Sequence, residues 1–384
     1  MKRYIYFDFA ATTPVDKRVL EAMVPYFSEK FGNSVSLHRL GQEALMALDF
    51  SRDALRKYVN AKSLREIIFT SNATESNNIA LKGVALYSFF RKKIKPHIIT
   101  TTIEHSSIGN VVKNLFELGI AEIDFVSPNK NGLIDIEILK TLIKENTVLV
   151  SIHYVNSEIG VVQKVKEIGE LLENLNKNRK SKIYFHIDAA QAGLTEVIDV
   201  QELKCDLLTF SSHKIYGPKG VALLYIKDGT EIEPLFSGGQ QEYGFRPGTV
   251  AVPLVVGFAK AVEILQNEFH QIKNHLTKIR DYFATKIKEI NVESNTDISV
   301  SSPKICNLYF PSKTSQEILI YLDQNGFAIS PGTACTARAM KSSQVVSEVF
   351  RDENRGKKSV RFSFGKETTE EDIDLLISTL KKFV

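Results

Sequence analysis

Residues 209–220 have the sequence Thr209-Phe210-Ser211-Ser212-His213-Lys214-Ile215-Tyr216-Gly217-Pro218-Lys219-Gly220. An apolar run at 207–210 leads into this polar segment, and a second apolar run at 221–226 follows its glycine- and proline-rich turn. The pattern predicts two strands of a sheet with Lys214 at the edge between them. A lysine at such an edge can lose its proton and attack a carbonyl carbon, although a solvated turn lysine is the commoner case.

A second apolar run that ends in a polar residue favours the nucleophilic role of Lys214 over that of a solvated turn lysine. The apolar run Ile183-Tyr184-Phe185-His186-Ile187 ends in Asp188. A pyridoxal 5'-phosphate (PLP) site needs a lysine for the cofactor's aldehyde and an acid for its pyridine nitrogen. Two neighbouring strand ends that carry Asp188 and Lys214 therefore predict a PLP site, with a Schiff base on the lysine.

The composition is that of an ordinary globular protein. The chain has 384 residues, 43% apolar and 24% charged, which is enough for two domains. Its formal charge of +4 is too small to predict binding to nucleic acid or to a membrane. No apolar run approaches the roughly 20 residues of a membrane-spanning helix, and the first residues lack the apolar core of a signal peptide. Three cysteines make no disulfide framework, so we expect a cytoplasmic protein.

Strands and helices alternate through the first two thirds of the chain. Apolar, strand-like runs are expected at 66–70, 97–102, 123–126, 148–153, 183–187 and 206–211. Helical spacing fills the intervals, which predicts a mostly parallel sheet covered on both faces. The run 221–226 is expected at an antiparallel edge of this sheet. Such sheets bind ligands beyond their carboxyl strand ends.

The pattern changes near residue 254. A long helix is expected at 255–288, linking two domains, and it is followed by short strands at 307–310, 327–330 and 360–364. The basic stretch 351–358 is expected to be a solvated loop. We therefore predict an α/β chain with a large domain at 14–257 and a smaller α+β domain formed by 1–13 and 258–384.

Three further polar residues follow predicted strands. Thr74 stands at a strand-to-helix junction, which suits a phosphate or simple helix capping. His105 can lie flat on a cofactor ring or be an ordinary surface histidine. Asn156 can donate to the cofactor's phenolic oxygen, bind a substrate carboxylate, or form a turn.

Two basic positions suit anions. The glycine-rich segment 237–249 offers Arg246 and Thr249, unless it is a long flexible loop. In the alternating run 359–365, Arg361 faces away from the apolar positions and could fork a carboxylate. A surface arginine on an edge strand is the alternative.

The three cysteines differ in context. Cys205 and Cys306 lie in apolar runs and are predicted to be buried thiols. Cys335 lies among small residues with Arg338 nearby. An exposed thiol near positive charge ionises readily, so Cys335 is the candidate nucleophile.

Taken together, these motifs resemble the cysteine desulfurases, the NifS/IscS-like group of PLP enzymes in the class V aminotransferase family. The similarity runs from Tyr4 to Asp372. Its most specific pieces are four motifs in order: Ala73-Thr74-Glu75-Ser76-Asn77-Asn78, Asp188-Ala189-Ala190-Gln191, the run 212–220, and Gly332-Thr333-Ala334-Cys335. The spacing from Cys335 to Arg361 resembles the family's long-loop branch. The sequence departs from the usual pattern at Phe9, Ser157 and Ala251.

The resemblance implies a PLP-dependent transferase of fold type I and a homodimer. It implies that one set of residues holds the cofactor: Lys214 as the Schiff-base lysine, Asp188 on the ring nitrogen, His105 stacked on the ring, Asn156 and Gln191 near the phenolic oxygen, and Thr74, Ser211, His213 and the partner's Thr249 on the phosphate. No metal ligands are implied.

The resemblance also implies the reaction. Arg361 with Asn156 would bind the carboxylate of L-cysteine, and Cys335 would receive its sulfur as a persulfide before transfer to an acceptor protein, such as an iron–sulfur scaffold or a thiolation protein. A selenocysteine lyase or another class V aminotransferase or lyase is the alternative enzyme. A catalytically idle partner protein with the same fold is disfavoured because Lys214, Asp188, His105 and Cys335 are all present.

Overall fold

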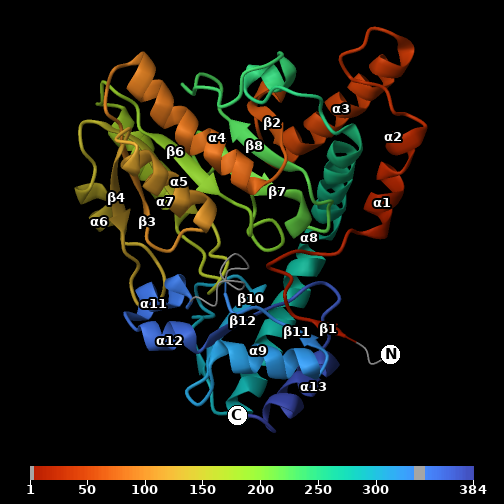
Figure 1. Ribbon diagram of the computed structural model, residues 1–384, viewed down its shortest axis with the longest axis vertical. Coiled ribbons are helices and arrows are strands. Elements are labelled where there is room, and N and C mark those ends of the chain that lie inside the picture. Colours follow the sequence, from red (N-terminus) through yellow and green to blue (C-terminus); the bar gives the residue numbers. More distant parts are fainter. Residues whose placement is uncertain (1–3, 333–341) are drawn as a thin grey trace.

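A seven-stranded sheet forms the upper part of the molecule (Figure 1). The computed structural model describes residues 4–332 and 342–384. The strands lie in the order β2 (Ile67–Thr70), β8 (Ala222–Ile226), β7 (Leu207–Ser211), β6 (Tyr184–Asp188), β5 (Thr147–His153), β3 (His97–Thr101) and β4 (Glu122–Val126). Only β8 runs against the others, since it pairs antiparallel with both β7 and β2. The predicted, mostly parallel sheet is confirmed.

The expected place of β8 at the sheet edge is wrong. β8 has a paired strand on each side, and all five of its residues are buried. A strand that is apolar on both faces needs neighbours for its main-chain N–H and C=O groups as well. The strand β2 supplies the second neighbour and is itself the edge.

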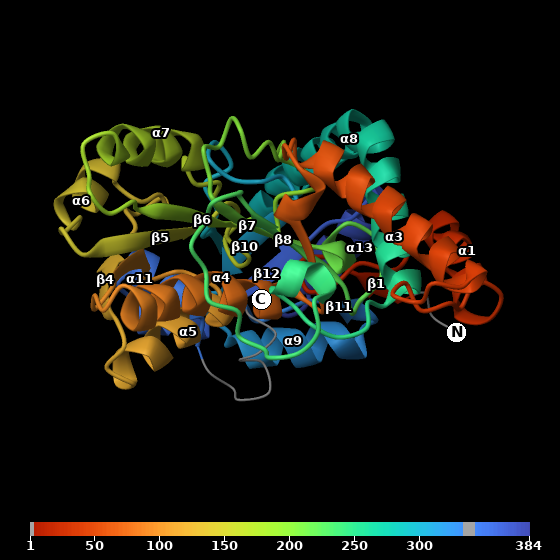
Figure 2. The same ribbon diagram turned by 90° about the horizontal axis from the view of Figure 1, so that it is seen from above.

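Helices cover both faces of this sheet (Figure 2). On one face lie α4 (Ala73–Leu86) and α5 (Ser106–Glu117), with one apolar cluster beneath them. On the other lie α3 (Arg39–Tyr58), α7 (Val165–Asn176) and α8 (Val252–Lys286), over a second cluster. Burial on both faces explains why the interior strands are apolar throughout rather than alternating.

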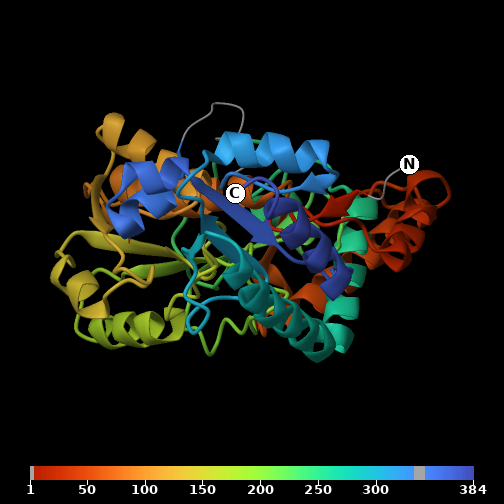
Figure 3. The ribbon, with the colours of Figure 1, turned by 90° about the horizontal axis from the view of Figure 1, so that it is seen from below.

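A three-stranded antiparallel sheet forms the lower part (Figures 1 and 3). Its order is β12 (Ser359–Ser363), β10 (Ile305–Tyr309) and β9 (Glu293–Ser294). The short strands β1 (Ile5–Tyr6) and β11 (Phe327–Ala328) pair beside it, so the start of the chain joins the C-terminal part. The helices around it are α9 (Ser315–Gln324), α11 (Gln344–Phe350), α12 (Glu353–Lys357) and α13 (Glu370–Leu380).

One local prediction is wrong. The basic stretch 351–358 is no loop, because it contains α12, whose first turn is capped by the Asp352 side chain accepting from Arg355 N. Near the start of the chain, two short helices follow one another, α1 (Lys17–Met23) and α2 (Pro25–Ser28). Pro25 has no N–H to continue the first helix and instead begins the second. The helix α6 (Ile136–Thr141) precedes β5.

The 35-residue helix α8 joins the two sheets. Near its start, Phe258 packs on Phe210 of β7, with ring centroids 5.8 Å apart. Near its end, Phe283 packs on Phe362 of β12 at 5.5 Å. One buried apolar cluster therefore extends from one sheet to the other, and the edge of the larger sheet is held against the smaller one.

A buried histidine in the larger sheet makes stability depend on pH. His186 of β6 lies between Ser151 Oγ (2.9 Å from Nδ1) and Thr209 Oγ1 (3.2 Å from Nε2). Burial lowers the pKa of His186 to about 4, with Asp188 opposing the shift. The unfolded chain takes up this proton near pH 6.5, above the pKa in the folded state, so acidification through pH 6.5 to 4 favours unfolding.

We expect the free energy of unfolding to fall by about 2 kcal/mol between pH 7 and pH 5 from this group alone. Equilibrium urea unfolding of the wild type and of His186→Gln measures it, because glutamine cannot titrate. The variant should lose correspondingly less stability over the same interval. Equal losses in the two proteins would show that His186 does not contribute.

Candidate active site

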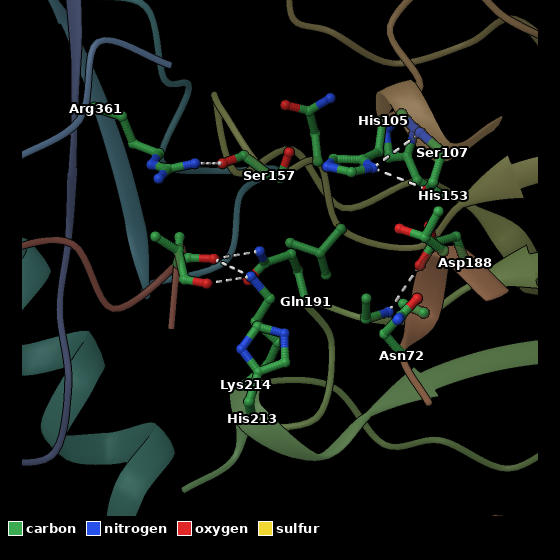
Figure 4. A pocket seen from close by; sticks show the side chains of 17 residues that line it. Asn72, His105, Ser107, His153, Ser157, Asp188, Gln191, His213, Lys214 and Arg361 are labelled. Carbon is green, nitrogen blue, oxygen red and sulfur yellow. Dashed lines mark hydrogen bonds between the residues drawn. The ribbon is translucent and has the colours of Figure 1, made fainter. Parts of the chain in front are cut away.

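The carboxyl ends of the larger sheet open into a pocket of about 230 Å³ that faces the smaller sheet (Figure 4). Parallel strands bring their carboxyl ends to one edge, which is where ligands bind in such sheets. Eight of the predicted site residues line it: Thr74, His105, Asn156, Asp188, Gln191, His213, Lys214 and Arg361. Ser211 and Thr249 do not line this pocket, and Cys335 lies outside the described residues.

Lys214 ends the single 3₁₀ turn that follows β7. Its Nζ donates to the main-chain oxygens of Ala10, at 2.6 Å, and Ala11, at 2.7 Å. Those two alanines precede Thr12-Thr13-Pro14, where the small residues allow the N-terminal chain to pass directly beside the lysine. The amine is therefore aimed into the pocket by neutral carbonyls.

Asp188 is the last residue of β6, next to β7. Its Oδ2 accepts a hydrogen bond from Asn77 Nδ2 at 2.8 Å, and its Oδ1 accepts from Ala190 N at 3.0 Å. The carboxylate is thus fixed in direction on both oxygens. Figure 4 shows Asp188 and Lys214 pointing into the same pocket from adjacent strand ends.

His105 caps α5 and is linked to Asp188 through two side chains that the sequence did not single out. Ser107 N donates to His105 Nδ1 at 3.1 Å, and Ser107 Oγ lies 2.9 Å from the same nitrogen. Asn77 Nδ2 donates to Ser107 Oγ as well as to Asp188, both at 2.8 Å. Burial lowers the pKa of His105 despite the nearby Asp188 charge. The ring is neutral at pH 7, and it offers a flat face to the pocket.

The N-terminus of α4 supplies the pocket's unpaired main-chain donors. The helix is capped by Asn72, whose side chain accepts from Glu75 N, so Thr74 is not the cap and its side chain lines the pocket. The first N–H groups of a helix lack intrahelical partners and attract anions. This removes the capping alternative for Thr74.

The two other residues predicted to bind the phosphate lie at the end of β7 and in the turn that follows it. Ser211 Oγ is buried and has no hydrogen-bond partner in the part of the chain that the structure describes. His213 Nδ1 lies 3.1 Å from Thr12 Oγ1. Burial lowers the pKa of His213 to about 3, with the Lys214 charge adding to the shift, so this ring is also neutral.

Arg361 reaches the pocket from β12 of the smaller sheet. Val360, Phe362 and Phe364 are buried on the opposite side of the strand, as the alternation predicts. Arg361 Nη1 donates to the Ser157 carbonyl and Nη2 donates to Asp8 Oδ1, both at 2.7 Å. Only the main chain of Ser157 is used, which explains how serine is accommodated there. The guanidinium is an internal cation at the pocket wall, not a surface arginine on an edge strand.

Asn156 and Gln191 have different tasks. Asn156 forms a turn: its Oδ1 accepts from Glu158 N and Ile159 N, and its Nδ2 donates to the Ile103 carbonyl. The turn-forming alternative is therefore confirmed, although the side chain also lines the pocket. Gln191 Nε2 donates to the Ala10 carbonyl at 2.8 Å, which leaves its second amide N–H on the pocket side.

The segment 237–249 is held in place rather than flexible. Glu242 is buried and pairs with Arg52 of α3 at 2.6 Å, and its second oxygen accepts from Phe69 N at 2.7 Å. Thr249, at the end of this segment, is exposed and does not line the chain's own pocket. Arg246 pairs with Glu75 at 3.0 Å.

The two described cysteines are buried, as predicted. Burial raises the pKa of Cys306 to about 12 and the pKa of Cys205 well above its usual range. Neither thiol is ionised near pH 7, so neither is a competent nucleophile.

Comparisons with known proteins identify the family of this chain. The family model described as aminotransferase class V matches residues 5–376. The chain belongs to the class V aminotransferase family. Among its curated relatives, a protein named cysteine desulfurase IscS from Dictyoglomus turgidum is 38% identical over all of this chain and 95% of its own length. One of the same name from Neisseria meningitidis serogroup C is 39% identical over 99% and 92%.

Solved structures agree. A NifS-like protein superposes with a TM-score of 0.91 at 34% identity, covering 99% of this chain and 98% of its own. A structure titled SspA in complex with cysteine superposes with a TM-score of 0.80 at 33% identity, covering 95% and 100%. The predicted resemblance to the cysteine desulfurases and the predicted fold are confirmed. Enzymes of this family use PLP, and a lysine and a pinned carboxylate on adjacent strand ends fit that cofactor.

Among the site residues that the sequence did not single out, we expect Asn77 to be the one whose loss has the largest effect. Removing a donor from a buried carboxylate costs about 1–3 kcal/mol, which corresponds to a change of about tenfold or more in an equilibrium constant. We expect Asn77→Ala to weaken PLP binding by about tenfold, measured by dialysis against PLP. The matched control is Asn78→Ala, whose side chain is half-buried and donates to the Thr74 carbonyl rather than to Asp188. Equal affinity in the two variants would contradict a role for Asn77 in holding Asp188.

Proposed function

We propose that this chain is a PLP-dependent cysteine desulfurase. It would convert L-cysteine to L-alanine and pass the sulfur to an enzyme cysteine and then to an acceptor. The observation that carries the proposal is that Lys214 and the fixed Asp188 carboxylate line one pocket. Full-length similarity to proteins named cysteine desulfurase supports it.

The pocket residues fit the parts of PLP. Lys214 would take the aldehyde and Asp188 the ring nitrogen, with the flat, neutral His105 ring on one face of the cofactor. The α4 N-terminus with Thr74, His213 and the unpartnered Ser211 hydroxyl would hold the phosphate. When bound, PLP supplies an electron sink for the bonds at the substrate Cα.

Substrate binding would fall to the opposite wall. Arg361 is fixed by Ser157 and Asp8 but keeps further N–H groups, which suit the planar carboxylate of an amino acid. Asn156 lines the same wall. Once substrate has displaced it, the Lys214 amine is the base positioned to move the Cα proton. The solved SspA complex with cysteine supports L-cysteine as the substrate.

The sulfur would be taken up by Cys335. Its thiolate attacks the substrate sulfur, so that a new S–S bond forms, the substrate's Cβ–S bond breaks, and the electron pair of that bond remains on the substrate. Protonation of that carbon yields alanine. The high pKa values of the buried Cys205 and Cys306 thiols leave Cys335 as the chain's one remaining cysteine for this step.

A homodimer would complete the site. Six large apolar side chains between residues 31 and 50 are exposed, with Leu37 at 93% and Phe50 at 76%. A patch of this kind marks a protein–protein interface. The Arg52–Glu242 pair fixes the segment that ends at Thr249, and this exposed residue, which does not line its own pocket, would reach the partner's phosphate site. We also propose that residues 14–257 form a large domain and that residues 1–13 and 258–384 form a small one, with α8 joining the two.

The downstream acceptor would be a protein such as an iron–sulfur scaffold or a thiolation protein, in the cytoplasm. In the described ranges, no helix combines the length and the apolar character needed to cross a bilayer. A selenocysteine lyase remains the second candidate, and the presence of Cys335 favours the desulfurase over it.

Replacement of Cys335 separates these functions. In Cys335→Ser the cofactor pocket is intact, so PLP binding and the change in its visible spectrum on adding L-cysteine should remain. Release of sulfide and alanine should fall at least about 1,000-fold, because a serine hydroxyl is a poor nucleophile at pH 7. Cys306→Ala is the control and should retain turnover.

Two outcomes would contradict the proposal. Undiminished desulfuration of L-cysteine by Cys335→Ser would exclude Cys335 as the sulfur carrier. Loss of L-cysteine turnover with full turnover of selenocysteine in the same variant would favour the lyase, provided that the wild type also acts on selenocysteine.

A further inference from the structure

Lys304 is a fully buried lysine that the proposed reaction does not use. Its side chain has no solvent exposure and is among the largest wholly buried side chains of the molecule. Its main chain belongs to the smaller sheet: its carbonyl accepts from Phe364 N at 2.8 Å, and its N–H donates to Ser302 Oγ at 3.3 Å. The backbone of Lys304 is therefore fixed at the start of β10.

The Lys304 amine crosses to the larger sheet. Its Nζ lies 3.3 Å from Gln191 Oε1 and 3.4 Å from the Lys214 carbonyl oxygen. Gln191 follows β6, which ends in Asp188, and Lys214 itself follows β7. The amine thus contacts the back of the pocket at the two segments on which the chemistry depends.

The chemistry of the amine suits these two neutral acceptors. Within the described residues, no carboxylate forms an ion pair with Lys304, and burial of an unpaired ammonium is costly. Burial, together with the charges of Lys214 and Arg361, lowers the pKa of Lys304 well below its usual range, and Asp8 opposes the shift only in part. A neutral amine has two N–H donors, which matches two acceptors.

The contact between Lys304 Nζ and Gln191 Oε1 fixes the orientation of the Gln191 side-chain amide. A glutamine amide can be turned to present either oxygen or N–H groups. With Oε1 directed to the Lys304 amine, Nε2 donates one hydrogen to the Ala10 carbonyl at 2.8 Å. Its second hydrogen remains for the pocket that Gln191 lines. The Ala10 carbonyl also accepts from Lys214 Nζ, so the three side chains form one hydrogen-bonded group.

We propose that Lys304 is a positioning residue of the active site, which orients the Gln191 amide as a hydrogen-bond donor toward the phenolic oxygen of the cofactor and anchors the main chain of Lys214. The inference rests on the proposed PLP site. It assigns the smaller sheet a role at the back of the cofactor pocket, in addition to the contribution of Arg361 to the pocket wall.

The test removes the Lys304 amine with a substitution that leaves no cavity. Lys304→Met has a similar length and no donor, and an apolar replacement of a buried amine need not destabilise the fold. We expect the melting temperature of the apoprotein to be preserved or raised. Affinity for PLP, measured by equilibrium dialysis of the apoprotein, should fall by about tenfold, as for the loss of one or two hydrogen bonds. The pH titration of the bound cofactor's visible absorbance should also shift.

Three further variants make the result specific. Lys304→Gln retains N–H donors and should recover part of the affinity. In a Gln191→Met background, Lys304→Met should cost much less than in the wild type, because the two residues act through one contact. Lys260→Met, on the surface of α8 and paired with Glu263, controls for loss of a lysine and should bind PLP as the wild type does.

Unchanged affinity and an unchanged titration in Lys304→Met would overturn the inference, as would full additivity with Gln191→Met. Those results would leave the proposed function intact, since the wild type would still bind PLP. Failure of the wild type to bind PLP would instead refute the proposed function.

Discussion

The structure depends on a topological constraint: parallel strands place their carboxyl ends at the same edge of a sheet. β6 and β7 are neighbours in register, with Asp188 opposite Thr209. The chain leaving β7 therefore turns at once beside Asp188, and the 3₁₀ turn presents Lys214 to the same space. The buried apolar strands fix this edge so firmly that two ionisable groups can be kept in one pocket.

The surrounding polar groups make that pocket usable. A buried carboxylate or amine is tolerated only when its hydrogen bonds are provided. Asn77 and Ala190 N serve Asp188, while the carbonyls of Ala10 and Ala11 serve Lys214. The smaller sheet contributes from the other side, with Arg361 at the pocket wall and Lys304 behind it. The long helix α8, packed on both sheets, keeps these two sources of side chains together.

Much of this arrangement could be predicted from the sequence, because it depends on local pattern. The apolar runs that end in Asp188 or lead to Lys214 correctly predict strand ends. The alternation in 359–365 correctly predicts that Arg361 lies on the side of the strand opposite the apolar side chains. What could not be predicted depends on contacts between distant segments. The position of β8 inside the sheet, the Asn77 link from α4 to Asp188, and the Lys304 contact with Gln191 each join residues that are more than 100 positions apart. Nothing in a local pattern marks such a lysine as buried.

The central claim is that Lys214, and no other amine, is the site of cofactor attachment. The most direct measurement is borohydride reduction of the PLP-loaded protein, followed by proteolysis and mass mapping of the pyridoxyl group. We expect the label on Lys214, with none on Lys219 in the adjacent turn or on the buried Lys304. Label on either of those lysines, or labelling that persists unchanged in Lys214→Ala, would contradict it.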